Sequence, residues 1–150
     1  MAEYVYNEIQ VVQPGASALL NDAIPCNRGY VIHRPGSGIL TVRGVVNNPC
    51  ARFARYRVYF DGNIAVPTGI TAGEIQLALS IGGEIIPTSI GAATPTVVNA
   101  YWKVSGFAII DVPAGCCYTV SVDNASEGAA AAAAPSVNIR NLNVEVTRLA

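Results

Sequence analysis

The side chains best suited to catalysis or metal binding are few in this chain and lie far apart along it. The chain has one histidine, His33, and four cysteines, Cys26, Cys50, Cys116 and Cys117. Catalytic metal sites combine two or three histidines with a carboxylate, and structural zinc sites need four ligands at characteristic spacings. Because the sequence holds a single histidine and no Cys-x-x-Cys pair, we predict no metal site and no metal cofactor.

Nucleophilic and carboxylate catalysis are also poorly supported. A Ser–His–Asp or Cys–His arrangement would have to use His33, but the surrounding YVIHRPGSG places it at the end of a strand before a turn. The ten carboxylates are scattered singly, so none forms the pair that glycoside hydrolysis requires. The glycines at 82–83 precede a strand-like segment rather than a helix, and no phosphate-binding loop is present. We therefore expect no enzyme activity, no catalytic residue and no cofactor.

The N-terminal sequence MAEYVYNEIQVV indicates the compartment in which the chain is made. It lacks the positive n-region and the apolar h-region of a signal peptide, so we expect synthesis in a cytoplasm, where disulfides are rare. All four cysteines are then expected to be buried thiols. Cys116 and Cys117 would point to opposite faces of a strand, so at most one of them faces a given core. No window approaches 18 apolar residues, and we expect no membrane contact.

Alternation of apolar and polar residues with period two runs through most of the chain and predicts β-strands. The clearest example is GEIQLALSI, in which Ile75, Leu77, Leu79 and Ile81 share one face. In another segment Tyr56, Val58 and Phe60 share a face opposite Arg55, Arg57 and Tyr59. Other expected strands cover residues 4–12, 29–33, 38–44, 97–110, 118–123 and 137–149.

Turn residues separate these strands at short intervals, about every 8–15 residues, which is typical of an antiparallel sandwich or barrel. Asp61–Gly62–Asn63 predicts a tight hairpin turn, because all three residue types tolerate positive φ. In the last strand the apolar phase changes between Ile139 and Leu142. A slip of one residue would exchange the two faces, so we predict a β-bulge near Arg140–Asn141. The whole chain, 1–150, is expected to form one domain.

The composition predicts an assembly. Hydrophobic residues make up 51% of the chain and charged residues 13%, against about 25% charged in an ordinary soluble domain. So few charges leave large neutral or apolar areas facing water, and such areas are usually partner surfaces. The alternative is a monomer whose surface is made of Ser, Thr, Asn and Gly. A net charge of −1 gives no basic surface for nucleic acid.

Three segments are candidates for contacts with partners. The N-terminal strand 4–12 carries Tyr4 and Tyr6, and the segment CARFARYRVYF carries Arg52, Arg55 and Arg57. The arginines would either dock an acidic partner or lie with their stems over aromatic rings on a solvated sheet. An alanine run is either a loop or helical turn at one end of the sandwich, or a set of small side chains near a symmetry axis: Ala129, Ala130, Ala131, Ala132, Ala133 and Ala134.

The second half of the chain, about residues 55–150, resembles a known family. The phrase Gly83–Ile86–Pro87, the turn Val112–Pro113–Ala114–Gly115 and the final Val144–Val146–Arg148–Leu149 are similar to motifs of BclA-type bacterial spore-surface glycoproteins. Those C-terminal domains belong to the C1q/TNF-like jelly-roll group. The chain differs from them because it has no Gly-X-Y collagen stalk. The resemblance implies an all-β antiparallel jelly-roll sandwich and a homotrimer with apolar side chains along a threefold axis.

Stalkless domains of this kind are also similar to decoration and head-fibre proteins of tailed-phage capsids. The resemblance therefore implies a structural virion protein, with further copies of itself and the major capsid protein or another lattice as partners, on the virion surface after assembly in the bacterial cytoplasm. A spore or cell-surface layer protein is the alternative. A receptor- or glycan-binding head is a third possibility, for which Tyr101 and Trp102 could supply a sugar platform. Alternation favours burial of one of them, and we expect Trp102 to pack in the core.

Overall fold

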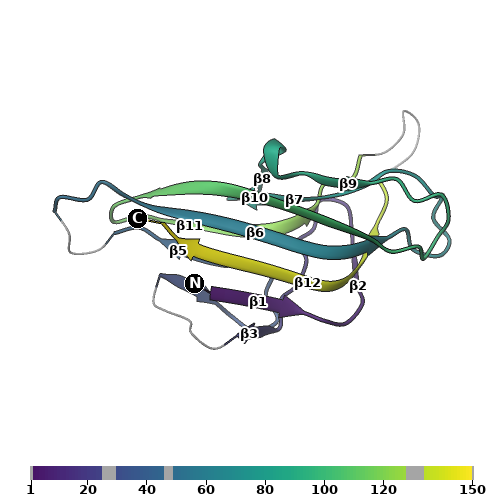
Figure 1. Ribbon diagram of the computed structural model, residues 1–150, viewed down its shortest axis with the longest axis horizontal. Helices are drawn as coiled ribbons and strands as arrows, with labels where there is room; N and C mark the ends of the chain where they lie inside the picture. Colours follow the sequence, from purple (N-terminus) through teal and green to yellow (C-terminus); the bar gives the residue numbers. More distant parts are fainter. Residues whose placement is uncertain (1, 25–29, 46–48, 128–133, 150) are drawn as a thin grey trace.

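The computed structural model describes residues 2–24, 30–45, 49–127 and 134–149. Within these ranges the chain forms strands and one short 3-10 helix, arranged as two antiparallel sheets (Figure 1). The first sheet has the order β10–β6–β12–β1–β3, and β2 also pairs with β12. Its strands are β1 (Ala2–Tyr6), β2 (Gln10–Val12), β3 (Asp22–Ile24), β6 (Phe53–Ala65), β10 (Trp102–Pro113) and β12 (Val137–Arg148).

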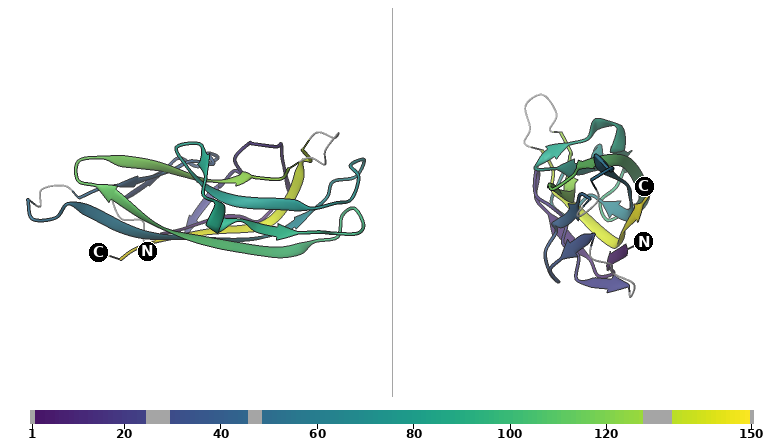
Figure 2. Two further views of the ribbon diagram at one scale, coloured as in Figure 1. Left: turned by 90° about the horizontal axis from the view of Figure 1, so that it is seen from above. Right: turned by 90° about the vertical axis from the view of Figure 1, so that its left-hand side faces the viewer.

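The second sheet has the order β4–β5–β11–β7–β8, and β9 also pairs with β7. Its strands are β4 (Val31–His33), β5 (Leu40–Arg43), β7 (Ile75–Ile81), β8 (Glu84–Ile85), β9 (Gly91–Ala93) and β11 (Cys117–Asn124), with the 3-10 helix η1 (Pro87–Ser89) between β8 and β9. Figure 2 shows the two sheets stacked as layers when the molecule is viewed along its long axis. This arrangement confirms the predicted antiparallel sandwich.

The hydrophobic core lies between the sheets and is built by the alternation seen in the sequence. Tyr56, Val58 and Phe60 on β6 are fully buried, as predicted, while Arg55 and Arg57 are exposed on the other face. In β7 the predicted inward face is also buried, but Ala78 and Ser80 on its opposite face have no exposed surface either. Both faces of the middle of β7 are therefore covered.

The β-bulge predicted near Arg140–Asn141 is present in β12. The pairing with β6 shifts between Arg140 and Asn143, and Asn141 takes a φ of 55°. Since Arg140 pairs with Asn63 and Asn143 with Asp61, two residues of β12 stand opposite Gly62 alone. That count of two against one defines a bulge.

The predicted hairpin turn at Asp61–Gly62–Asn63 is wrong. These residues lie inside β6 and pair with β10 on one side and β12 on the other. Gly62 serves close packing rather than a turn, because an added Cβ would lie 3.3 Å from the Leu142 Cδ1 and that side chain would have to shift. The glycine makes room for the bulge of the neighbouring strand, a use of strand glycine that local turn propensity does not reveal.

The first expected strand, 4–12, is divided into β1 and β2, and both pair with β12. Both chain ends lie at the same end of the elongated molecule (Figure 1), where Ala2 pairs with Val146 and Arg148 pairs with Tyr56. We call this the terminal end. The opposite end, where β10 begins and β6 finishes, is called the distal end. No helix in the described part of the chain is long and apolar enough to cross a membrane.

Candidate functional site

The outer face of the first sheet carries a group of exposed apolar side chains near the terminal end. Phe53 is 42% exposed, Phe107 is 53% exposed and Ile109 is 57% exposed. Cross-strand pairing places Phe107 beside Tyr59 and Ile109 beside Arg57. We call Phe53, Tyr59, Phe107 and Ile109 the apolar patch. Exposed side chains of this size, grouped on one sheet face, are characteristic of a partner surface.

Arginines cover the rings of this patch. The Arg57 guanidinium carbon lies 5.7 Å from the Tyr59 ring centre and 5.4 Å from that of Phe107. The Arg55 guanidinium carbon lies 5.1 Å from the Phe53 ring. Cation–π contacts at these distances cover part of each ring while the charged heads remain solvated, and much of Phe53 and Phe107 stays exposed. The two predicted candidates Arg55 and Arg57 thus lie on the patch, whereas Arg52 is exposed on the loop before β6.

Arg55 also forms a two-pronged ion pair with Asp111 on the neighbouring strand. Arg55 Nε donates to Asp111 Oδ1 at 2.7 Å, and its Nη2 donates to Oδ2 at 2.9 Å. The guanidinium lowers the pKa of the Asp111 carboxyl, chiefly through the hydrogen bond, and the same bond raises the pKa of Arg55. Such an exposed pair adds little stability, but it fixes the orientation of both side chains at the edge of the patch.

The acidic side of this outer face lies on β12 and β1, the strands farther from β10. Glu145 on β12 pairs with Tyr59 on one side and with Glu3 of β1 on the other. Phe107, Tyr59, Glu145 and Glu3 therefore form one row across the sheet, aromatic at the β10 side and acidic at the β1 side. Two glutamates directly opposite each other repel. The face consequently has an arginine-rich half and a glutamate-rich half.

The outer face of the second sheet is different. Its cross-strand pairs include hydroxyl side chains, such as Thr41 with Thr119 and Ser80 with Ser121, of which Ser80 is fully buried. Asp123 accepts hydrogen bonds from the hydroxyls of Ser17 and Ser121, at 2.7 and 2.8 Å. This face is therefore polar and partly covered, with Ile32 and Ile85 as exposed apolar side chains on it, so the two faces of the sandwich differ in chemistry.

The remaining sequence candidates occupy varied positions. Tyr4 has no exposed surface and its ring centre lies 4.7 Å from that of His33, so it offers no surface for docking. The reason is its register, since Tyr4 pairs with the buried Val144 and shares its inward direction. Tyr6 is half-buried, and Ala134 is half-buried before β12. Ala129, Ala130, Ala131, Ala132 and Ala133 lie outside the described residues.

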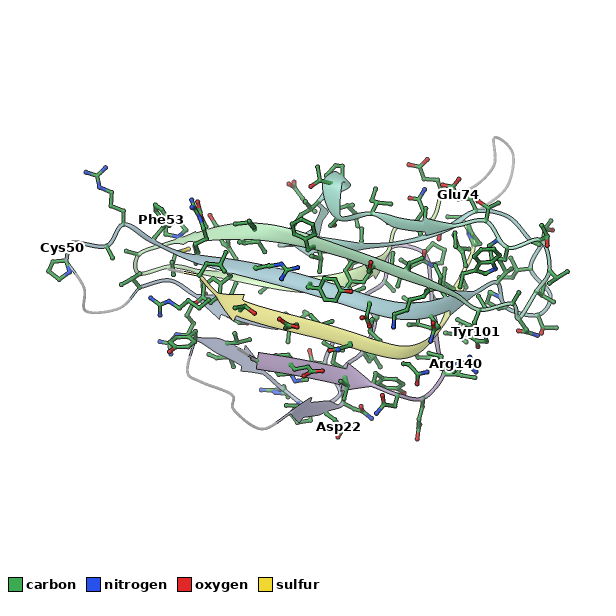
Figure 3. All side chains as sticks on the ribbon, viewed as in Figure 1. Asp22, Cys50, Phe53, Glu74, Tyr101 and Arg140 are labelled. Carbon is green, nitrogen blue, oxygen red and sulfur yellow. The ribbon has the colours of Figure 1, made fainter. Side chains whose placement is uncertain are left out.

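The prediction of buried thiols is wrong for the cysteines that the structure describes. Cys50, Cys116 and Cys117 are all exposed, and Cys26 lies outside the described residues. They lie at the terminal end, where Ala114 N donates to Arg52 O at 2.9 Å and brings the turn before β11 close to the loop before β6 (Figure 3 labels Cys50). Among the described residues, no three His, Cys, Asp or Glu side chains are placed to hold a metal ion.

The distal end carries the aromatic side chains of Trp102 and Tyr101, and the sequence predicted a different environment for Trp102. Trp102, expected in the core, is 56% exposed. Its cross-strand partner Ile64 is fully buried, but Trp102 is the first residue of a strand at the sheet edge, where the sandwich ends. Tyr101 is half-buried, and the Arg140 guanidinium carbon lies 4.3 Å from its ring centre (Figure 3).

Comparison with known proteins defines the fold. No protein-family model and no curated sequence matches the chain. The chain is similar to the Eiger TNF of S. frugiperda, with a TM-score of 0.66 and 13% identity, covering 100% of this chain and 92% of that one. It is also similar to the globular domain of the zebrafish complement 1qA protein, with a TM-score of 0.54 and 14% identity, covering 96% and 94%. At this identity the similarity shows the fold, which is the predicted C1q/TNF-like jelly roll.

Proposed function

We propose that this chain is a structural subunit that forms a homotrimer through the outer face of its first sheet and is displayed on the exterior of a particle. The observation that carries the proposal is the apolar patch, with Phe107 and Ile109 each more than half exposed. The resemblance to the C1q/TNF-like group implies the same oligomeric state, with apolar side chains facing a threefold axis.

The size of the face fits a specific contact. Strands β6, β10 and β12 are 12 or 13 residues long, so together they form a face of about 40 Å by about 14 Å. That is about two thirds of the area that a standard interface buries on each partner, roughly 800 Å². The free edge of β10 would supply the rest. The face is therefore large enough to join copies of the chain when its edge takes part.

The charges on this face favour a second copy as the partner. The row Phe107–Tyr59–Glu145–Glu3 is aromatic at one side and acidic at the other, and Arg57 lies on the aromatic side. If the arginine-rich half of one copy meets the glutamate-rich half of the next, each Glu3–Glu145 repulsion is relieved. A head-to-tail contact of this kind closes into a ring when the rotation fits. After the dimer, the trimer is the smallest ring that contacts of this kind can close.

A tailed-phage capsid is our first choice of particle, with the chain as a decoration or head-fibre subunit docked on the major capsid protein. The low charge content favours an assembly, and the resemblance that we draw from the sequence to stalkless phage domains is our reason for choosing a capsid. The alternative is a spore or cell-surface layer protein of the BclA-like group, supported by the motifs at residues 83–87, 112–115 and 144–149.

The particle assignment is tested by protein composition. Virions and spores of the source organism are purified by density gradient, and the copies of this chain per particle are counted by quantitative mass spectrometry. We expect the chain in virions in copy numbers that are multiples of three. Stoichiometric recovery from spores and none from virions would select the alternative. Recovery from neither particle would refute the proposal.

A further inference from the structure

Two arginines from different sheets come together at the terminal end of the molecule. Arg148 is the last residue of β12 and pairs with Tyr56 of β6. Arg43 is the last residue of β5, and its backbone carbonyl accepts a hydrogen bond from the Tyr56 hydroxyl. The Arg148 guanidinium carbon lies 4.9 Å from the ring centre of Tyr30, and the Arg43 N–H donates to the Tyr30 carbonyl at 2.8 Å. We call Arg43, Arg148 and Tyr30 the terminal cluster.

The positive charges of the terminal cluster act on the same hydroxyl group. Burial raises the pKa of Tyr56, and the charges of Arg148 and Arg43 both oppose this rise. The two guanidinium groups therefore lie in one neighbourhood, where like charges repel each other. Arg43 has no carboxylate of the described residues within ion-pair distance. A negatively charged partner at this end would relieve the repulsion.

The carboxylates of the neighbouring described strands do not neutralise the cluster. Asp111 forms its ion pair with Arg55, through hydrogen bonds of 2.7 and 2.9 Å. Glu145 lies an odd number of residues before Arg148 in β12, so its side chain points to the opposite face of the sheet. Glu84 is on β8, three strands from β5 and so about 14 Å away. The described part of the terminal end is therefore positive, although the whole chain has a net charge of −1.

The surroundings of the cluster favour a protein segment over a nucleic acid. Tyr30 is 38% exposed, and Leu149, next to Arg148 in the chain, is 49% exposed. Arginine and tyrosine are enriched among the side chains that anchor protein interfaces, and each guanidinium offers paired N–H donors to a carboxylate. Nucleic acid needs many phosphate contacts along a basic surface, which a chain with a net charge of −1 does not provide.

We infer that the terminal cluster of Arg43, Arg148 and Tyr30 docks an acidic protein segment, whose carboxylates bind the two guanidinium groups. The inference rests on the proposed function for the identity of the partner, because a subunit docked on a particle through this end would meet an acidic surface of the lattice. Copies in a cyclic trimer are related by rotation about one axis. The three clusters then lie at the same height along that axis and can bind one lattice together, which raises the overall affinity.

Fluorescence anisotropy of a fluorescein-labelled, end-capped hexaglutamate peptide measures the docking on the full-length protein. Labelled heptathymidylate is the matched probe for nucleic acid, because it carries six phosphates against six carboxylates. We expect saturable binding of hexaglutamate and at least fivefold weaker binding of heptathymidylate. No binding of hexaglutamate would overturn the inference. Equal or tighter binding of heptathymidylate would also overturn it, because the cluster would then attract any polyanion.

The double variant Arg43→Gln, Arg148→Gln tests the named residues. Arg140→Gln is the matched control, because Arg140 lies over Tyr101 at the distal end in a similar contact. We expect the double variant to weaken hexaglutamate binding by about 10-fold or more, as loss of charge-assisted hydrogen bonds does, and Arg140→Gln to leave it unchanged. Arg43→Gln alone keeps the Arg148–Tyr30 contact and should weaken binding by about threefold or more. Urea midpoints verify that the variants fold.

The result separates the site from the proposed function, because the assay uses no particle. Unchanged binding by Arg43→Gln and by the double variant, or an equal loss with Arg140→Gln, would refute the site even if virions contain the chain. Binding that requires Arg43 and Arg148 supports the site even if neither virions nor spores contain the chain.

Discussion

Replacing Ile109 by glutamate gives the sharpest test of the proposed trimer face. Ile109 is 57% exposed in the single chain, so burying the remainder against a neighbour contributes about 1 kcal/mol per chain. A carboxylate there would lie opposite Arg57 of its own chain, but it would also face the glutamate-rich half of the next copy, and burying it beside those like charges costs about 3 kcal/mol. The total, about 4 kcal/mol per chain, is about 12 kcal/mol for three chains, provided that the three sites act independently.

That free energy sets the expected shift in the assay. The concentration at half-dissociation of a trimer varies as the square root of its dissociation constant, so about 12 kcal/mol moves it by about four orders of magnitude. Analytical ultracentrifugation across nanomolar to millimolar concentrations measures the midpoint. Ile32→Glu is the matched control, because Ile32 is 53% exposed on the opposite sheet, in β4. Equal shifts in the two variants, or no shift in Ile109→Glu, would refute the assigned face.

Three further predictions concern the fold itself. In native protein without denaturant, a maleimide followed by mass mapping should label the exposed thiols of Cys50, Cys116 and Cys117. Gly106→Ala should lower the free energy of unfolding, measured in urea, by about 2–3 kcal/mol, because the added Cβ would lie 2.1 Å from Ser89 O. Gly73→Ala is the control and should change this free energy little, because Gly73 has open space around it. Burial raises the pKa of Tyr4 and Tyr56 above the usual value, so their neutral forms stabilise the fold below about pH 10, and stability should fall as pH rises beyond it. Tyr56→Phe, which removes the hydroxyl that donates to the Arg43 carbonyl, should cost about 1 kcal/mol and weaken that fall; unchanged alkaline stability in this variant would contradict the assignment.

The sequence predicted those features that depend on local periodicity. Period-two alternation identified the inward face of Tyr56, Val58 and Phe60, and the change of phase after Ile139 located the β12 bulge. Both follow from the rule that a slip of one residue reverses the faces of a strand. The fold type was confirmed by structural similarity.

The features that the sequence missed depend on neighbours distant along the chain. The turn signal of Asp61–Gly62–Asn63 is overridden because two strands pair with this segment and Gly62 accommodates the Leu142 side chain. Trp102 obeys alternation but lies where the sandwich ends, so its predicted burial fails. The Tyr101–Arg140 contact joins residues almost 40 positions apart, and no local pattern connects them.

Native mass spectrometry of the unmodified chain at micromolar concentration measures its oligomeric state directly. We expect a single dominant species of about 47 kDa, three times the 15.6 kDa chain mass. Its population should persist on dilution to the low micromolar range. A dominant species at 15.6 kDa under the same conditions would contradict the trimer and, with it, the proposed role of the first sheet's outer face.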